Sequence, residues 1–167
     1  IMGPCHAEEV ALEKLSYLTL ACQNQDTAKF LAQQMSCNYI RTKVTDDTIG
    51  AEYAGTLKNI YAIAVGIAHG LGYGDNFQSV LMSNSIRELK RFLKQIHNAK
   101  RDMSHSAYLG DLLVTGYSLF SRNRMLGTMI GKGYTVKSAL HEMTMICEGY
   151  YASNTAHLLT EEFDKSF

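Results

Sequence analysis

The sequence predicts a mainly α-helical protein that begins with a short strand–helix–strand unit. Its 167 residues include a single proline and thirteen glycines, a composition that favours long uninterrupted helices with glycine at their ends. Apolar residues recur at spacings of three and four after Thr45, whereas β-prone and alternating stretches occur only before it. We therefore expect a helical bundle behind a small α/β piece.

The N-terminal part contains the α/β pattern. Residues 15–22, "LSYLTLAC", are β-prone, and "QDTAKFLAQQMS" at 25–36 has helical spacing with Asp26 as a candidate cap. In "NYIRTKV" the residues Tyr39, Arg41 and Lys43 alternate with apolar or hydroxylated ones. A unit of this size cannot form a stable sheet alone, so it is expected to be the edge of a larger one.

Four helical segments follow. The first starts at the polar cluster "TDD" and ends at "GLGYGDN"; its apolar positions are Ile49, Tyr53, Leu57, Ile60, Ala64, Ile67 and Leu71. The second runs from about Asn76 to Asn98, with Ile86, Leu89, Leu93 and Ile96 inward and a basic outer face of Arg87, Lys90, Arg91 and Lys94, then Lys100 and Arg101. The third begins near Ser121 and ends at "GKG", and the fourth runs from about Val136 to Tyr151.

Composition excludes several classes of function. Sixteen basic and sixteen acidic residues balance, so no global charge favours nucleic acid. The basic face can contact phosphates or anionic lipid, or simply be solvated. The four cysteines form no C-x-x-C pair and the six histidines have no zinc spacing, so we expect reduced thiols and no metal site. The longest apolar run is too short for a membrane span.

Two glycine-rich patterns do not predict nucleotide binding. "GLGYG" at 70–74 has the wrong spacing for a dinucleotide loop and follows a helix, which favours a helix end and turn. "GTMIGKG" at 127–133 lacks the Ser or Thr of a phosphate-binding loop and closes a helix. No phosphate-binding loop of a nucleotide enzyme is therefore found in the chain.

Lys58 is the one charged residue between Glu52 and His69. On a helix its neighbours are Ala54, Gly55, Tyr61 and Ala62, most of them small, which leaves room for a ligand or a second helix. An ammonium among apolar groups is poised for general acid or base work at a hydroxyl or carbonyl. A lysine whose head reaches solvent at the helix edge is the alternative, and composition does not decide between them.

The segment "GDLLVTGYSLFSRNRMLG" at 110–127 bears on Lys58. Asp111, in a glycine-flanked loop, can pair with a buried ammonium. "SRNR" is expected to open a helix with Ser121 as the cap, so that free N–H groups and Arg122 converge on an anion such as a phosphate monoester. A solvated first turn is the alternative.

The segments "GPCHAEEV", "DDTIGAEYAGTLKNIYAIAVGIAHGLGYGDN", "GDLLVTGYSLFSRNRMLG" and "EGY" together resemble NAD(P)-dependent sn-glycerol-3-phosphate dehydrogenases of the bacterial type, in the same order. The resemblance implies that residues 1–45 are the C-terminal edge of a Rossmann-like cofactor domain. It implies that residues 46–167 are a substrate-binding helical bundle of the 6-phosphogluconate dehydrogenase C-terminal type. It also implies a fragment: the Gly-rich loop and a further substrate lysine would precede Gly3, and the last helices would follow Phe167.

The resemblance assigns a role to each matching position. Lys58 exchanges a proton with the oxygen on C2 of the substrate, and Asp111 lies near it. The implied substrate-binding residues are Gly3, Cys5, Lys58, Asp111, Ser121, Arg122 and Asn123. The implied contacts to the cofactor, NAD or NADP, are Ala7, Arg122, Ile146 and Glu148. Two positions depart from the family: Cys5 replaces a usual Ser or Thr, a stronger hydrogen-bond partner, and His6 replaces a usual aromatic residue.

The function implied for the parent protein is the cytoplasmic interconversion of sn-glycerol 3-phosphate and dihydroxyacetone phosphate, in glycerophospholipid synthesis. Its partners would be this small phosphate substrate and the missing cofactor domain; association with a second copy stays open. The isolated chain is expected to be inactive. Two alternatives remain: a related dehydrogenase for another 2-hydroxy or keto acid, and a non-catalytic helical interaction module.

Overall fold

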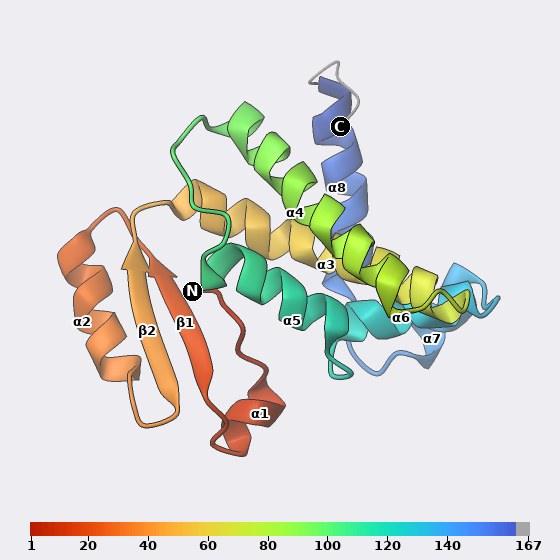
Figure 1. Ribbon diagram of the computed structural model, residues 1–167, viewed down its shortest axis with the longest axis horizontal. Helices are drawn as coiled ribbons and strands as arrows, with labels where there is room; N and C mark the ends of the chain where they lie inside the picture. Colours follow the sequence, from red (N-terminus) through yellow and green to blue (C-terminus); the bar gives the residue numbers. More distant parts are fainter. Residues whose placement is uncertain (163–167) are drawn as a thin grey trace.

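The computed structural model describes residues 1–162 and shows an α/β unit beside a helical bundle (Figure 1). The α/β unit consists of α1 (Ala7–Ala11), β1 (Ser16–Ala21), α2 (Gln25–Met35) and β2 (Ile40–Thr45). The bundle consists of α3 (Thr48–Gly70), α4 (Asp75–Ile96), a π-helical turn η1 (Ser106–Gly110), α5 (Asp111–Tyr117), α6 (Arg122–Gly131), α7 (Val136–Glu142) and α8 (Glu148–Glu162). The predicted fold class is confirmed.

Strands β1 and β2 are parallel, in a register that runs from Ser16 opposite Ile40 to Ala21 opposite Thr45. Helix α2 connects them and buries its small residues Ala28 and Ala32. The predicted cap is wrong: Asn24, not Asp26, caps α2, because its side chain accepts from the N–H groups of Asp26 and Thr27. The other edge of β1 pairs with the N-terminal segment through an antiparallel bridge between Met2 and Thr19.

Helix α3 is the centre of the bundle, with α4, α5, α6 and α8 packed around it. Its predicted apolar stripe is therefore too narrow, because helices on several sides bury several faces. Of that stripe only Leu57 is buried, and Ile49 and Leu71 are exposed. The buried residues of α3 are Gly50, Ala54, Leu57, Asn59, Tyr61, Ala62, Val65, Gly66 and Ala68.

Helices α3 and α6 approach each other through interlocking glycines. A Cβ at Gly66 would collide with the carbonyl oxygen of Arg124, and one at Gly127 would collide with that of Ile63. Gly70 and Gly131 face each other in the same way one turn further along. Gly127 and Gly131 of "GTMIGKG" thus serve helix packing, and they hold the second half of α6 against the C-terminal part of α3.

The C-terminal half differs from the prediction in two places. The helix predicted over 136–151 is two helices, α7 and α8, separated by residues 143–147. Asp111, predicted in a loop, is the first residue of α5 and directly follows the π-helical turn. The prediction of a helix end at "GLGYG" is confirmed, since α3 stops at Gly70 and Gly72 has a φ of 86°.

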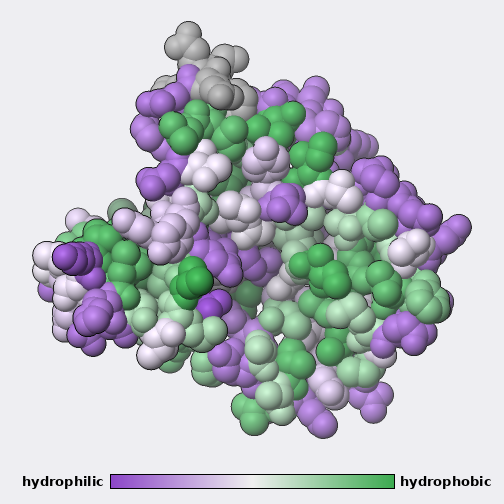
Figure 2. All heavy atoms as spheres, turned by 180° about the vertical axis from the view of Figure 1, so that it is seen from behind, coloured by the Kyte–Doolittle hydropathy of each residue, from purple (hydrophilic) through white to green (hydrophobic). Residues whose placement is uncertain are grey.

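Figure 2 shows apolar residues spread over a broad part of the reverse face. The α/β unit contributes several exposed large apolar side chains, among them Leu12, Leu15, Tyr17 and Phe30. Within residues 1–162, no helix is both long and apolar enough to cross a membrane.

Candidate active site

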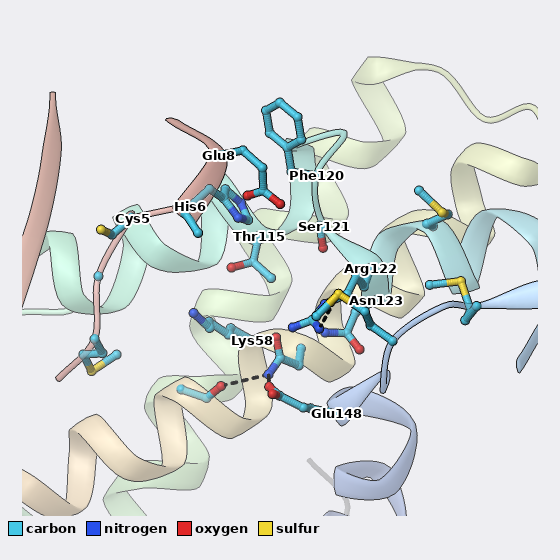
Figure 3. Close-up of a pocket in the computed structure, with 18 of the residues that line it drawn as sticks. Cys5, His6, Glu8, Lys58, Thr115, Phe120, Ser121, Arg122, Asn123 and Glu148 are labelled. Carbon is cyan, nitrogen blue, oxygen red and sulfur yellow. Dashed lines mark hydrogen bonds between the residues drawn. The ribbon is translucent and has the colours of Figure 1, made fainter. Parts of the chain in front are cut away.

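A cleft of about 790 Å³ lies where the N-terminal segment meets the bundle (Figure 3). Its walls come from the N-terminal loop, the middle of α3, the first turn of α6, the segment between α7 and α8, and the first residue of α8. Eight of the predicted site residues line it: Gly3, Cys5, Ala7, Lys58, Ser121, Arg122, Asn123 and Glu148. Segments far apart in the sequence thus form one site.

Lys58 reaches from α3 to Asp111 at the start of α5. Its Nζ lies 2.7 Å from Oδ1 of Asp111, and the side chains are 22% and 2% exposed. Asp111 itself does not line the cleft but stands behind Lys58. Next to Lys58, Gly55 lines the cleft with nothing within 4 Å of where a Cβ would be. The lysine is therefore held by a buried carboxylate, with open space beside it.

The N-terminal loop is bound to the same carboxylate. The backbone N–H of Gly3 donates to Oδ2 of Asp111 at 3.2 Å. Gly3 has a φ of 140°, and a Cβ there would collide with the carbonyl oxygen of Tyr17, so the position requires glycine. Asp111 thus accepts hydrogen bonds from the loop and from Lys58 at once.

A second ion pair anchors the turn that carries Asp111. Arg101 donates to both carboxylate oxygens of Asp47, at 2.6 and 2.8 Å, and Tyr108 in η1 donates to the same carboxylate. The sequence placed Arg101 next to the basic outer face of α4, but its side chain is only 5% exposed and belongs to this ion pair instead. Asp47 also caps α3 by accepting from the N–H of Gly50. Besides the Lys58–Asp111 pair, this cluster is therefore a second connection between α3 and the turn that precedes Asp111.

The first turn of α6 forms the opposite wall of the cleft. Ser121 is its cap, as predicted, and accepts from the N–H of Arg124. Among residues 1–162, the Arg122 side chain makes a single hydrogen bond, 3.6 Å long, to the sulfur of Met145, so its guanidinium can turn to a ligand. Asn123 is buried, and its Oδ1 accepts from the N–H of Gly149 at 3.0 Å. Its amide nitrogen is left to donate to a ligand, which suits an anion.

The start of α8 closes the cleft near Lys58. Asn59 donates to Oε2 of Glu148 at 3.2 Å, and a Cβ on Gly149 would collide with the carbonyl oxygen of Asn59. This close approach explains the glycine of "EGY". The structure does not bring Ile146 to the cleft, since its side chain is 69% exposed and outside the lining.

The thiol of Cys5 is a weak participant. Burial raises its pKa, an effect that a hydrogen bond with Ser16 opposes and the negative charge of Asp111 reinforces. The thiol therefore stays neutral near pH 7, and a neutral thiol is a poor hydrogen-bond donor. Within residues 1–162, no group of three or more His, Cys, Asp or Glu side chains could hold a metal ion.

Several further residues of the cleft were not predicted from the sequence as site residues, among them His6, Asn59, Thr115 and Phe120. Asn59 directly follows Lys58, and this adjacency could have indicated that it belongs to the site. Thr115 is one helical turn after Asp111 and donates to its carbonyl oxygen at 2.6 Å. Phe120 carried no signal, because an aromatic residue before a helix cap reads as part of the core.

The chain resembles known proteins over nearly its whole length. A protein of Exiguobacterium sp., "Glycerol-3-phosphate dehydrogenase [NAD(P)+]", is 40% identical over 97% of this chain and 48% of its own length. The protein of the same name from Bacillus pumilus is 37% identical over 99% and 48%. The crystal structure of glycerol-3-phosphate dehydrogenase from Coxiella burnetii superposes with a TM-score of 0.94 at 32% identity, over 99% of this chain and 51% of that one. The chain spans about half the length of the curated relatives it matches.

The chain thus has a helical bundle attached to a small α/β unit, with the cleft where the N-terminal segment meets the bundle. The sequence profile of one family, described as "NAD-dependent glycerol-3-phosphate dehydrogenase C-terminus", matches residues 47–167. The chain belongs to this family.

Proposed function

We propose that the chain is the substrate-binding half of an enzyme that interconverts sn-glycerol 3-phosphate and dihydroxyacetone phosphate with NAD or NADP. The observation that carries the proposal is that Lys58, paired with Asp111 behind it, lines the same cleft as the cationic first turn of α6. A lysine fits proton exchange at a carbonyl, and a helix N-terminus with an arginine fits a phosphate. One small phosphorylated ketone satisfies both.

In the reduction, negative charge develops on the carbonyl oxygen at C2 of the substrate. Lys58 donates a proton to this oxygen, and Asp111 holds the ammonium in place through the 2.7 Å ion pair. Arg122, the amide nitrogen of Asn123 and the free N–H groups of α6 hold the phosphate at the other end. In the reverse direction Lys58 accepts the proton from the hydroxyl.

The cleft offers residues for only one part of a dinucleotide. Ala7, Arg122 and Glu148 line the cleft, and Ala7 is exposed. The nicotinamide supplies or accepts the hydride. We propose that its pyrophosphate is bound by a domain outside this chain, of which residues 1–45 are the C-terminal edge, with residues 46–167 as the substrate domain. The proposal keeps the predicted role in phospholipid synthesis. It also keeps the predicted cytoplasmic location, which fits the four free cysteines.

The test is turnover by the complete enzyme, in which the chain is joined to its cofactor domain. NADH or NADPH oxidation with dihydroxyacetone phosphate should exceed that with dihydroxyacetone, which lacks the phosphate, by at least about a hundredfold in kcat/KM, the value of a charge-assisted phosphate site. Equal rates would favour a dehydrogenase for another keto substrate. No rate with either would favour the interaction module.

A further inference from the structure

His6 stands out among the residues that line the cleft. Its Nε2 atom is buried and, within the described part of the chain, has no hydrogen-bond partner. Leaving a buried polar atom unpaired costs about 1–3 kcal/mol, and native proteins rarely do so without a functional reason. Because the His6 side chain lines the cleft, a turn of its ring would present this atom to a ligand, which would then supply the missing partner.

The neighbours of His6 indicate which part of the ligand it meets. Its ring packs against Phe120, with centroids 6.3 Å apart and the planes tilted by 58°. Phe120 directly precedes Ser121, the cap of α6. Figure 3 shows His6 and Phe120 near each other in the wall of the cleft. His6 thus lies beside the residue that leads into the first turn of α6, which carries Arg122.

We propose that His6 binds the substrate phosphate by donating a hydrogen bond from Nε2, and so closes the phosphate site from the N-terminal loop. The inference rests on the proposed function and adds a residue to its binding site. The other polar side chains of this loop that line the cleft are not good donors: Cys5 offers a neutral thiol, and Glu8 is an acceptor that opposes phosphate. The imidazole is then the one good donor that this loop's side chains provide.

Kinetics of the complete enzyme test the proposal with paired variants. His6→Phe keeps a ring against Phe120 but removes the donor, and should raise the KM for dihydroxyacetone phosphate about tenfold while kcat changes less than about twofold. The same variant should leave kcat/KM for dihydroxyacetone unchanged. His6→Gln, whose amide can donate from about the position of Nε2, should recover most of the loss. His69→Phe, on the exposed side of α3, is the matched control.

An unchanged KM for the phosphate ester in His6→Phe would overturn the proposal. So would an equal loss with both substrates, since that would indicate a distorted cleft. A nuclear magnetic resonance titration with inorganic phosphate provides a reading that does not need turnover: the Nε2 signal of His6 should shift and that of His69 should not. If the wild-type enzyme does not reduce dihydroxyacetone phosphate, the proposed function fails, and this titration alone decides the role of His6.

Discussion

Lys58 and Asp111, separated by 53 positions in the sequence, form a 2.7 Å ion pair whose carboxylate is almost fully buried. The ammonium is partly exposed to the cleft, so one partner is fixed and the other reaches the ligand. This arrangement suits a general acid, Lys58, that is held in position by a buried carboxylate.

Replacing Lys58 should affect turnover far more than binding. In the complete enzyme, Lys58→Ala should lower kcat by about 10²–10⁴-fold, the usual contribution of a positioned acid, while the KM for dihydroxyacetone phosphate changes by less than about threefold. Steady-state oxidation of NADH or NADPH measures both constants. Lys90→Ala, on the exposed face of α4, is the control. Wild-type kinetics for Lys58→Ala would end the assignment of the proton donor.

Replacing Arg122 should have the opposite signature. Within the described structure its guanidinium makes one hydrogen bond, to Met145, so Arg122→Ala removes the proposed phosphate ligand without breaking an ion pair. The KM for the phosphate ester should rise about 10–100-fold, as expected for a charge-assisted hydrogen bond, with a smaller change in kcat. Arg87→Ala on α4 should change neither constant. A pure loss of kcat would instead place Arg122 at the reacting atoms.

The glycine contact between α3 and α6 should be sensitive to a single methyl group. In Gly127→Ala the new Cβ would meet the backbone of Ile63, which cannot move without displacing α3; we expect a loss of about 1–3 kcal/mol in the free energy of unfolding. Gly55→Ala is the matched control, because no atom lies within 4 Å of its Cβ position. It should unfold at the same urea concentration as wild type or a higher one. Equal loss in both variants would contradict the packing argument.

The Asp47 cluster should make part of the stability depend on pH. Burial of Asp47 works to raise the pKa of its carboxyl, but hydrogen bonds from Arg101, Tyr108 and Gly50 outweigh burial and lower it. A carboxyl whose pKa is lower in the folded state stabilises the fold above its unfolded pKa of about 4. That stability is lost as the pH falls through the folded pKa.

Asp47→Asn should therefore cost about 3 kcal/mol at pH 7, since it leaves Arg101 buried without its counterion. The difference from wild type should shrink below about pH 4, where wild type loses the same interaction. Urea unfolding at pH 7 and pH 3 measures this, with the adjacent exposed Asp46→Asn as the control. A difference that stays constant with pH would show that the charge of Asp47 is not involved.

Local patterns were sufficient to predict the helices with strong periodicity and clear ends. The caps at Asp47 and Ser121 follow from short polar side chains at helix starts. The split between α7 and α8 could not be predicted, because the apolar residues of 143–147 continue the helical spacing. The burial of several faces of α3 could not be predicted either. Periodicity identifies one apolar face of a helix, but not how many other helices pack around it.

Residues of the site were predictable to different degrees. Lys58 stood out as a lone charge in an apolar segment, and "SRNR" as a helix start. Asp111 was a candidate partner for Lys58 from the sequence, but only the resemblance placed it near that lysine, because nothing local shows that a π-helical turn anchored by Tyr108 precedes it. Arg101 was misplaced for a related reason: its partner Asp47 lies 54 positions away in the sequence.

The hydrogen bond from Gly3 to Asp111 means that the loop and the carboxylate hold each other in position. Pulling the loop away would strip a buried anion of a donor, a loss of about 1–3 kcal/mol that favours the return of the loop. The same movement would leave the carboxylate free to rotate, and the ammonium of Lys58 would follow it out of alignment. The position of the loop and the aim of the lysine are therefore coupled through one shared carboxylate.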